Sequence, residues 1–257
     1  KNATMDKSYP TSEWRIRPYY RLHLFDPDNP IYYDIGPRLQ LTSLLKPGLF
    51  LRGTFEKSVI TDFDQIYRGE KGNIPKVRTG LSKYLNNTDT RIRDLMASSY
   101  FKFNKNLYGR LSSGYFEPMY AGLSMEVLHL PIKSKFSFGA ELNYVKARSF
   151  KQDLSFREIK GLSKVNGHIS TYIDTGFYNY IGQLDMGRYL AGDKGATLTM
   201  TRRFPNGWDI GGFFTLTDVS YSDFGEGSFD KGFFIKIPIN SITPYETRSS
   251  ITEKVRP

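Results

Sequence analysis

The chain has 257 residues, a formal net charge of +10 and no cysteine, which excludes disulfides, thiolate metal sites and cysteine nucleophiles. Aromatic residues make up 15% of the sequence and the mean hydropathy is −0.46. No apolar run approaches the roughly 18–20 residues of a transmembrane helix. The positive charge suits a nucleic acid, an anionic lipid or an acidic polymer as a partner, and by itself it selects none of them.

Polar and apolar residues alternate with a period of two along most of the chain, beginning near its start. In residues 14–24, for example, Trp14 and Ile16 alternate with Arg15 and Arg17. Such alternation predicts β-strands, about twelve of them with roughly ten residues each. The predicted strands are 14–24, 31–41, 47–58, 92–103, 106–116, 119–130, 135–145, 167–177, 178–190, 195–203, 207–217 and 231–239.

The length of these strands separates two fold classes. Strands of soluble sheets usually run about 5–6 residues, whereas transmembrane β-strands need about 9–11 residues that alternate between lipid and lumen. Aromatic residues also gather near the predicted strand ends, as interfacial girdles do. We therefore predict an all-β fold, a transmembrane antiparallel β-barrel of about twelve or more strands. A soluble β-fold is the alternative.

Connector lengths predict how the barrel is oriented. Three long connectors, at 59–90, 147–165 and 218–230, all follow odd-numbered strands, so they lie at one end. Outer-membrane barrels have long outer loops and short periplasmic turns, so we expect the chain to enter from the periplasm. We expect a single domain over residues 1–257, with residues 240–257 forming a tail or the start of a further strand.

One segment of the first long connector has helical character. In "IPKVRTGLSKYL", Pro75 suits a first helical position, and Val77, Leu81 and Tyr84 or Leu85 share one face. We expect a short helix within residues 60–90 that lies on the rim of the barrel or plugs its lumen.

Charged side chains recur on the polar, inward face of the predicted strands. Neighbouring strands would join the arginines of the first three into a basic wall. One interpretation is a network of ion pairs that holds the wall and plug in place; the other is an arginine lining that attracts an anionic polymer. Inward tyrosines would stack on sugar rings or simply pack. The candidate binding residues are Arg15, Arg17, Arg21, Arg38, Arg52, Asp34, Glu56, Glu141, Tyr19 and Tyr32.

Other chemistries have weaker support in the sequence. His23 and His168 face inward and could pair with Ser98, Ser112 or Ser170, but no spacing distinguishes any such pair as a hydrolase site. No H-E-x-x-H, Walker or EF-hand pattern occurs. No nucleic-acid-binding motif occurs either. We therefore expect no enzymatic activity, no metal or other cofactor and no nucleic-acid partner.

The segment "FGEGSFDKG", residues 224–232, is a glycine-rich stretch with charges. It lacks the spacing and the following helix of a phosphate-binding loop. Its glycines permit positive φ, so we interpret it as a connector into the strand 231–239. We expect Glu226, Asp230 and Lys231 to join a charge network at the outer rim or in the lumen.

Several long blocks resemble a known family. "GRYLAGDKGATLTMTRRFPNGWDIGGFFTLTDV" (187–219) and "FGEGSFDKGFFIKIPI" (224–239) closely resemble the exopolysaccharide-biosynthesis outer-membrane family of YjbH and GfcD type. The resemblance extends over "LYGRLSSGYFEPMYAGLSMEVLHLP" and "GHISTYIDTGFYNY". It implies an outer-membrane β-barrel of a family that includes lipoproteins and is encoded with capsule or exopolysaccharide secretion genes. Family members are usually longer, and this chain corresponds to their C-terminal part.

The resemblance and the basic inner face together lead to one expected function. We expect a non-enzymatic role in secretion or surface anchoring of exopolysaccharide or capsule, in the bacterial outer membrane. The expected partners are outer-membrane lipid, an anionic polysaccharide and other subunits of an envelope complex. Two alternatives stay open: a plugged structural barrel that scaffolds a larger complex, and a hydrolase of the lumen or rim that acts on lipid or polymer.

Overall fold

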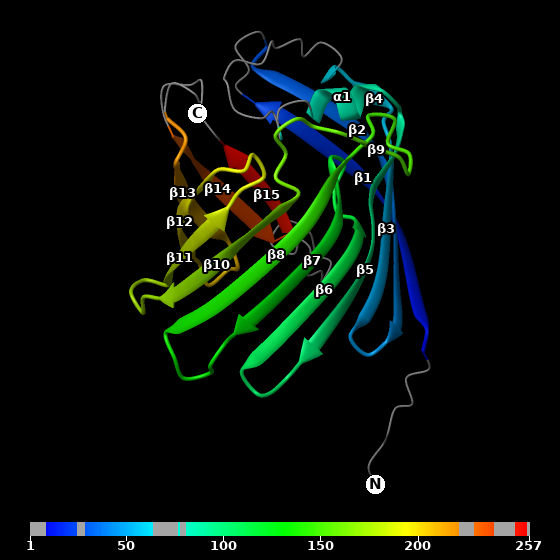
Figure 1. Ribbon diagram of the computed structural model, residues 1–257. Helices are drawn as coiled ribbons and strands as arrows, with labels where there is room; N and C mark the ends of the chain where they lie inside the picture. Colours follow the sequence, from blue (N-terminus) through cyan, green and yellow to red (C-terminus); the bar gives the residue numbers. More distant parts are fainter. Residues whose placement is uncertain are drawn as a thin grey trace.

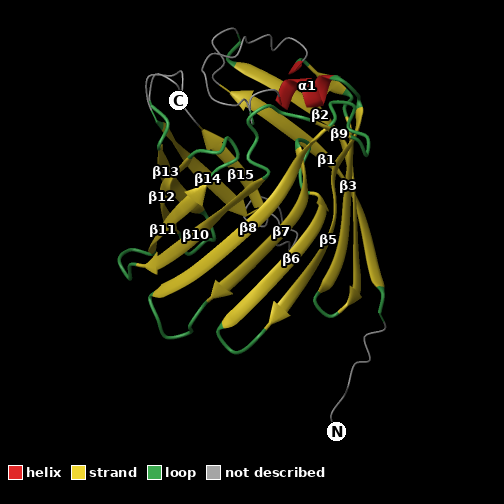
Figure 2. Cartoon of the chain, in the orientation of Figure 1, coloured by secondary structure: helices red, strands yellow, loops and turns green. Residues whose placement is uncertain are grey.

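The computed structural model describes residues 9–24, 29–63, 77, 81–220, 229–238 and 250–255. These residues form one antiparallel sheet of 15 strands with a single short helix (Figures 1 and 2). The prediction of an all-β, antiparallel fold is therefore confirmed. In the described parts of the chain, no helix has the length and apolar character needed to span a membrane.

Strands that follow one another along the chain are hydrogen-bonded neighbours in the sheet. The main path consists of β1 (Thr11–Leu24), β2 (Ile31–Lys46), β3 (Leu49–Lys57), β5 (Thr90–Lys102), β6 (Leu107–Tyr115), β7 (Tyr120–His129), β8 (Phe136–Arg148), β10 (Val165–Asp174), β11 (Tyr180–Arg188), β12 (Lys194–Arg203), β13 (Asp209–Thr217), β14 (Asp230–Pro238) and β15 (Ser250–Val255). Two short strands lie beside it: β4 (Ile60–Thr61) pairs with β2, and β9 (Phe156–Arg157) pairs with β8.

The antiparallel order sends the connectors alternately to the two ends of the sheet. The connectors after β3, β8 and β13 reach the same end, where α1 (Leu81–Asn86), β4 and β9 also lie (top of Figure 1). Where the structure describes the connectors of the other end, they are short turns. This agrees with the arrangement predicted from connector lengths. Within the described residues no pairing joins β1 to β15, so the curved sheet has two free edges.

The two faces of the sheet are inverted relative to those of a soluble protein. Large apolar side chains point outward, and Trp14 and Ile169 remain 68% and 61% exposed. On the inner face the buried side chains are polar or charged, among them Asp34, Glu56 and Asp209. Because exposing apolar surface to water is unfavourable, a soluble sheet would show the opposite pattern.

The short helix covers one end of the wall. α1 spans six residues, and its buried Tyr84 packs in an apolar cluster with Met119, Tyr120 and Val145. Leu85 packs with Tyr32 and Phe63 in a second cluster. Pro75, which we expected to begin the helix, lies outside the described residues.

Residues 250–255 of the expected tail form β15, which pairs with β14 in regular antiparallel register. The preceding residues 240–249 lie outside the described part of the chain. The segment "SITEKV" thus adds a strand to the sheet beyond the twelve that alternation predicted.

Gly36 marks a point where β2 and the β3–β4 segment approach closely. Residues 57–59 lie opposite only 36–37, so the β3–β4 segment bulges there. A Cβ at Gly36 would lie 1.9 Å from the carbonyl oxygen of Lys57. We therefore expect Gly36→Ala to lower the free energy of unfolding by about 1–3 kcal/mol, measured by urea titration in detergent.

A matched control exists at Gly139, where a Cβ would meet its nearest atom at an ordinary 3.6 Å. Gly139→Ala should therefore change stability little. Equal effects of the two substitutions would show that general strand propensity, and not the close approach at Gly36, controls the result.

Candidate functional site

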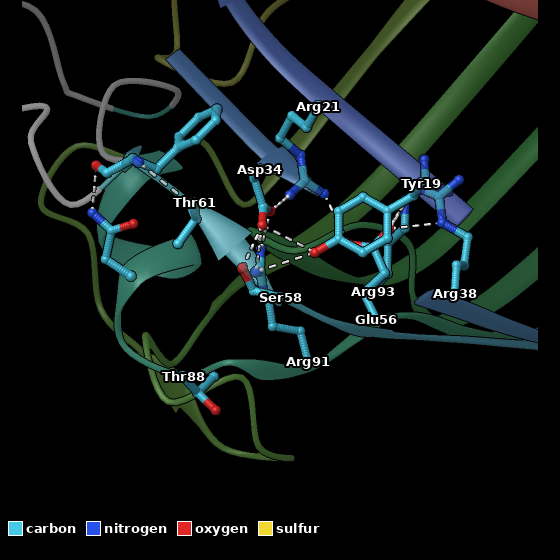
Figure 3. A network of polar contacts seen from close by, with 12 residues as sticks. Tyr19, Arg21, Asp34, Arg38, Glu56, Ser58, Thr61, Thr88, Arg91 and Arg93 are labelled. Atoms are coloured by element: carbon cyan, nitrogen blue, oxygen red, sulfur yellow. Dashed lines mark hydrogen bonds and ion pairs between the residues drawn. The ribbon is translucent and has the colours of Figure 1, made fainter. Parts of the chain in front are cut away.

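Charged side chains gather on the inner face of β1, β2, β3 and β5, near the long-connector end of the sheet (Figure 3). The strand register explains this, because oppositely charged residues are direct cross-strand partners. Arg21 lies opposite Asp34, Arg38 opposite Glu56, and Glu56 opposite Arg91. We call this group the arginine–carboxylate cluster; it consists of Tyr19, Arg21, Asp34, Arg38, Glu56, Ser58, Arg91 and Arg93.

Asp34 is the most enclosed carboxylate of the cluster, with no exposed surface. Its Oδ2 accepts hydrogen bonds from Arg21 Nη1 at 2.6 Å and Arg91 Nη1 at 2.9 Å. Its Oδ1 accepts from Ser58 Oγ at 2.5 Å and from the Tyr19 hydroxyl at 3.1 Å. Two guanidinium groups and two hydroxyl groups therefore replace the water that this carboxylate loses on burial.

Glu56 links the neighbouring strands. It accepts from Arg21 Nη2 at 2.8 Å and Arg38 Nη2 at 2.6 Å, and Arg93 Nε lies 3.7 Å away. Arg21 thus bridges Asp34 and Glu56. The Arg21 and Arg38 guanidinium groups also lie over the Tyr19 ring, 5.5 and 5.2 Å from its centroid. The cluster is one connected network that ties four strands together.

The cluster carries more positive than negative charge. Four arginines surround two carboxylates, which leaves an excess of two positive charges. Arg91 is buried, whereas the side chains of Arg38 and Arg93 are 28% and 42% exposed. The two partly exposed arginines are therefore the ones that an anionic ligand can reach.

The opposite part of the inner face has a different character. His168 Nδ1 lies 3.1 Å from Glu141 Oε1, and Ser170 Oγ donates to Asp185 at 2.5 Å. The ring of Tyr189 lies against His168, with centroids 4.6 Å apart. This region offers hydroxyl groups and carboxylates, whereas arginines dominate the arginine–carboxylate cluster.

The remaining sequence candidates lie outside the cluster. Arg15 forms an exposed ion pair with Glu13 at 3.0 Å. Arg17 lies opposite Arg38 in the β1–β2 register. Arg52 pairs with Asp94 at 3.0 Å, one step closer to the short-turn end. Tyr32 is buried in the apolar cluster under α1, where packing occupies its ring.

Two of the three candidates in the glycine-rich segment lie in the described part of the chain. Glu226 lies outside the described residues. Asp230 and Lys231 begin β14, and as consecutive strand residues they point to opposite faces of the sheet. Lys231 Nζ lies 5.0 Å from the centroid of the Phe229 ring.

Among the described side chains, the serines and the histidine considered for catalysis do not form a triad. Ser98 and Ser112 hydrogen bond to each other at 2.9 Å, and Ser170 bonds to Asp185. None of the three contacts His168, whose described partner is Glu141. The side chain of His23 lies outside the described residues. In the described ranges, no three histidine or carboxylate side chains gather as a metal site.

Sequence reasoning missed Arg91, Arg93 and Ser58. The spacing Arg91–Ile92–Arg93 was a usable signal, because arginines two apart on a strand share a face. The predicted strand began at residue 92, one position too late to include Arg91. Ser58 lies two residues after Glu56, so the same period places it on the inner face, whereas its contact with Asp34 depends on the register between strands.

A buried arginine also ties the loops to the wall. Arg148 ends β8 with no exposed surface, and its Nη1 donates to the carbonyl oxygens of Glu117 at 2.7 Å and Arg93 at 3.3 Å. Its guanidinium lies over the ring of Tyr115 at 4.7 Å. Arg157 of β9 donates to the hydroxyl of Tyr84 at 2.9 Å. The Arg148 contacts hold the β6–β7 turn and β5 against the end of β8, and the Arg157 hydrogen bond joins β9 to α1.

Comparison with known proteins identifies the family of this chain. A family model described as "YjbH: Exopolysaccharide biosynthesis protein YbjH" matches residues 1–257. The "Uncharacterized lipoprotein YjbH" of Escherichia coli (strain K12) is 30% identical over 241 residues, which cover 92% of this chain and 34% of that protein. The chain thus spans about a third of the relative's length. No solved structure matches. The chain belongs to the YjbH family of exopolysaccharide biosynthesis proteins.

Proposed function

We propose that the protein is an outer-membrane β-barrel that takes part, without catalysis, in secreting an anionic exopolysaccharide or anchoring it at the cell surface. The inverted sheet is the observation that carries this proposal. Its outward side chains are apolar and exposed, and its inward side chains are polar and buried. Lipid on one side and a polar lumen on the other account for both faces.

The long strands support the membrane location. β2, β5 and β8 have 16, 13 and 13 residues, and a tilted strand crosses the bilayer with about 9–11. The E. coli relative is a lipoprotein by name, which fits the cell envelope.

The arginine–carboxylate cluster supports an anionic polymer as the transported or anchored substrate. Arg38 and Arg93 are partly exposed, and the cluster has an excess of two positive charges. Rings of arginine attract anions in narrow passages. Family membership links the chain to exopolysaccharide and not to another anionic solute.

A plugged scaffold is the second candidate, and the cap formed by α1 and β9 favours it. Tyr84 is fully buried in an apolar cluster that joins these elements to β7 and β8. Conductance in planar bilayers distinguishes the candidates. A stable open channel would contradict the plug, whereas a closed barrel that gains conductance after Tyr84→Ala would support it.

The proposed function is tested in cells by deleting the gene and measuring secreted and cell-bound exopolysaccharide. We expect deletion to reduce export or retention, and complementation with the unmodified gene to restore it. Normal amounts of both fractions in the deletion strain would contradict the proposal. The full-length gene should be used, because the matched relative is longer than this chain.

The membrane location makes a separate prediction for Ile169, which points outward near the middle of β10. Ile169→Lys should destabilise the barrel in lipid vesicles by about 2–4 kcal/mol, the cost of a lysine at the bilayer midplane. Heat-modifiable gel mobility and urea titration in vesicles measure this. Thr199→Lys places the same charge on the inner face and should be tolerated. Equal tolerance of both would favour the soluble β-fold.

A further inference from the structure

The short-turn end of the sheet has a surface that the proposed export function does not use. Exposed apolar side chains stand on its turns and adjoining strand ends, and Ile132 is 85% exposed. The others are Phe101, Phe103, Phe177 and Tyr178. Figure 1 shows these turns along the lower edge of the sheet, opposite α1. We call this surface the short-turn rim.

Lysines are interspersed with these apolar side chains. Lys46, Lys102, Lys105, Lys133 and Lys135 are exposed and lie in or beside the turns after β2, β5 and β7. Throughout the part of the chain that the structure describes, none of the five forms an ion pair. Their charge is therefore available to an outside partner.

The described carboxylates of the same end are already engaged. Asp209 accepts from Arg203 at 3.1 Å and Lys236 at 3.4 Å. Asp174 accepts from the backbone N–H of Gly176 at 3.0 Å. At the long-connector end, by contrast, acidic and basic residues alternate, and Lys164 pairs with Glu158 at 3.3 Å. Among the described residues, the five rim lysines therefore have no carboxylate partner at their own end.

The turn between β10 and β11 adds a second, independent observation. Tyr178 and Asn179 have φ of 43° and 58°, and Tyr180 N donates to the carbonyl oxygen of Phe177 at 2.9 Å. This tight turn normally takes asparagine or glycine at both central positions. Tyrosine there costs backbone strain, and the result is an aromatic ring held outward at the tip, 66% exposed.

We propose that the short-turn rim binds anionic phospholipid headgroups. The lysines contact the phosphates while the aromatic and aliphatic tips lie at the headgroup level, where amphipathic and basic residues are favoured. The inference rests on the proposed membrane location. It adds that the leaflet at this end contains anionic phospholipid. It also orients the protein, with the long connectors on the side away from the anionic phospholipid.

Intrinsic fluorescence reports on this rim, because both tryptophans of the chain lie at this end. Trp14 is near the start of β1, and Trp208 is in the turn before β13. The full chain is refolded into phosphatidylcholine–phosphatidylglycerol vesicles, with bromine on the acyl chains of one lipid at a time. Brominated phosphatidylglycerol should quench about threefold more strongly than brominated phosphatidylcholine at equal mole fraction. High salt should remove this preference.

Two matched variants locate the effect. The first changes Lys46, Lys102, Lys105, Lys133 and Lys135 to glutamine and should quench equally with both lipids. The second changes five exposed lysines of the other end and should keep the preference: Lys57, Lys83, Lys151, Lys160 and Lys164.

Three results would overturn the inference. The first is equal quenching by both lipids in the folded, unmodified protein. The second is an equal loss of preference in the two variants. A preference that persists in high salt would also contradict it. If neither lipid quenches and the protein shows no heat-modifiable mobility, the membrane location itself fails, which distinguishes that failure from a failure of the lipid preference.

Discussion

Replacing Asp34 with alanine is expected to lower the free energy of unfolding by about 3–5 kcal/mol, because it leaves a buried arginine without its counter-charge. The side chain of Arg91 is 1% exposed, and its one ion-pair partner among the described residues is Asp34. Its Nε already lacks a hydrogen-bond partner. Urea titration in detergent micelles, followed by tryptophan fluorescence, measures the loss.

Two controls separate this effect from a general loss of charge. Asp89→Ala removes an exposed carboxylate at the same end and should change stability by less than about 0.5 kcal/mol. The double variant Asp34→Leu, Arg91→Met removes the pair together and should recover most of the loss, since apolar replacements of a buried pair are often neutral. If the double variant is less stable than Asp34→Ala, the unpaired charge of Arg91 does not explain the loss, and other contacts of the cluster stabilise the wall.

Much of the inner face could be predicted from the sequence, because the side-chain period of a strand is two. Alternation alone assigned Arg21, Asp34 and Glu56 to one face, and the structure brings all three into contact. It also predicted that Glu141 and His168 share the inner face, where they now lie as a pair. A residue's face follows from local geometry, so it can be read from one strand at a time.

Contacts between strands could not be predicted in the same way, because they depend on register and on bulges. Ser58 shares the inward parity of Glu56, but its hydrogen bond to Asp34 depends on the register between β2 and the bulged β3–β4 segment. Tyr32 has the same inward parity as Asp34, yet Phe63 and Leu85 cover it. The connectors decide whether an inward ring is open to a ligand or covered by other side chains. Their sequences do not alternate, so their positions cannot be predicted in this way.

The cluster contains two kinds of arginine: those that hold its carboxylates in place and those that remain exposed to a ligand. Arg21 and Arg91 contact Asp34 directly, and Arg21 also contacts Glu56. Arg38 and Arg93 contact only Glu56 among the described carboxylates and are the more exposed pair. The fold requires the first two, so a ligand test should change the second two.

Changing Arg38 and Arg93 together to glutamine is therefore expected to weaken binding of a uronic-acid oligosaccharide by about tenfold or more, because two charge-assisted hydrogen bonds are lost. The change removes the excess of two positive charges, while Asp34 keeps two arginines and Glu56 keeps Arg21. Stability should consequently fall far less than in Asp34→Ala. Isothermal titration calorimetry in detergent, at low and high salt, measures the affinity.

The matched control changes Arg188 and Arg202, whose register places them on the outer face, to glutamine. Their loss alters the net charge equally but not the inner wall, so affinity for the acidic oligosaccharide should hold. A neutral oligosaccharide of the same length should bind all three proteins alike. If Arg38 and Arg93 can be neutralised in the folded protein with no loss of affinity, the cluster only stabilises the wall. The plugged scaffold would then account better for its arginines than polymer export does.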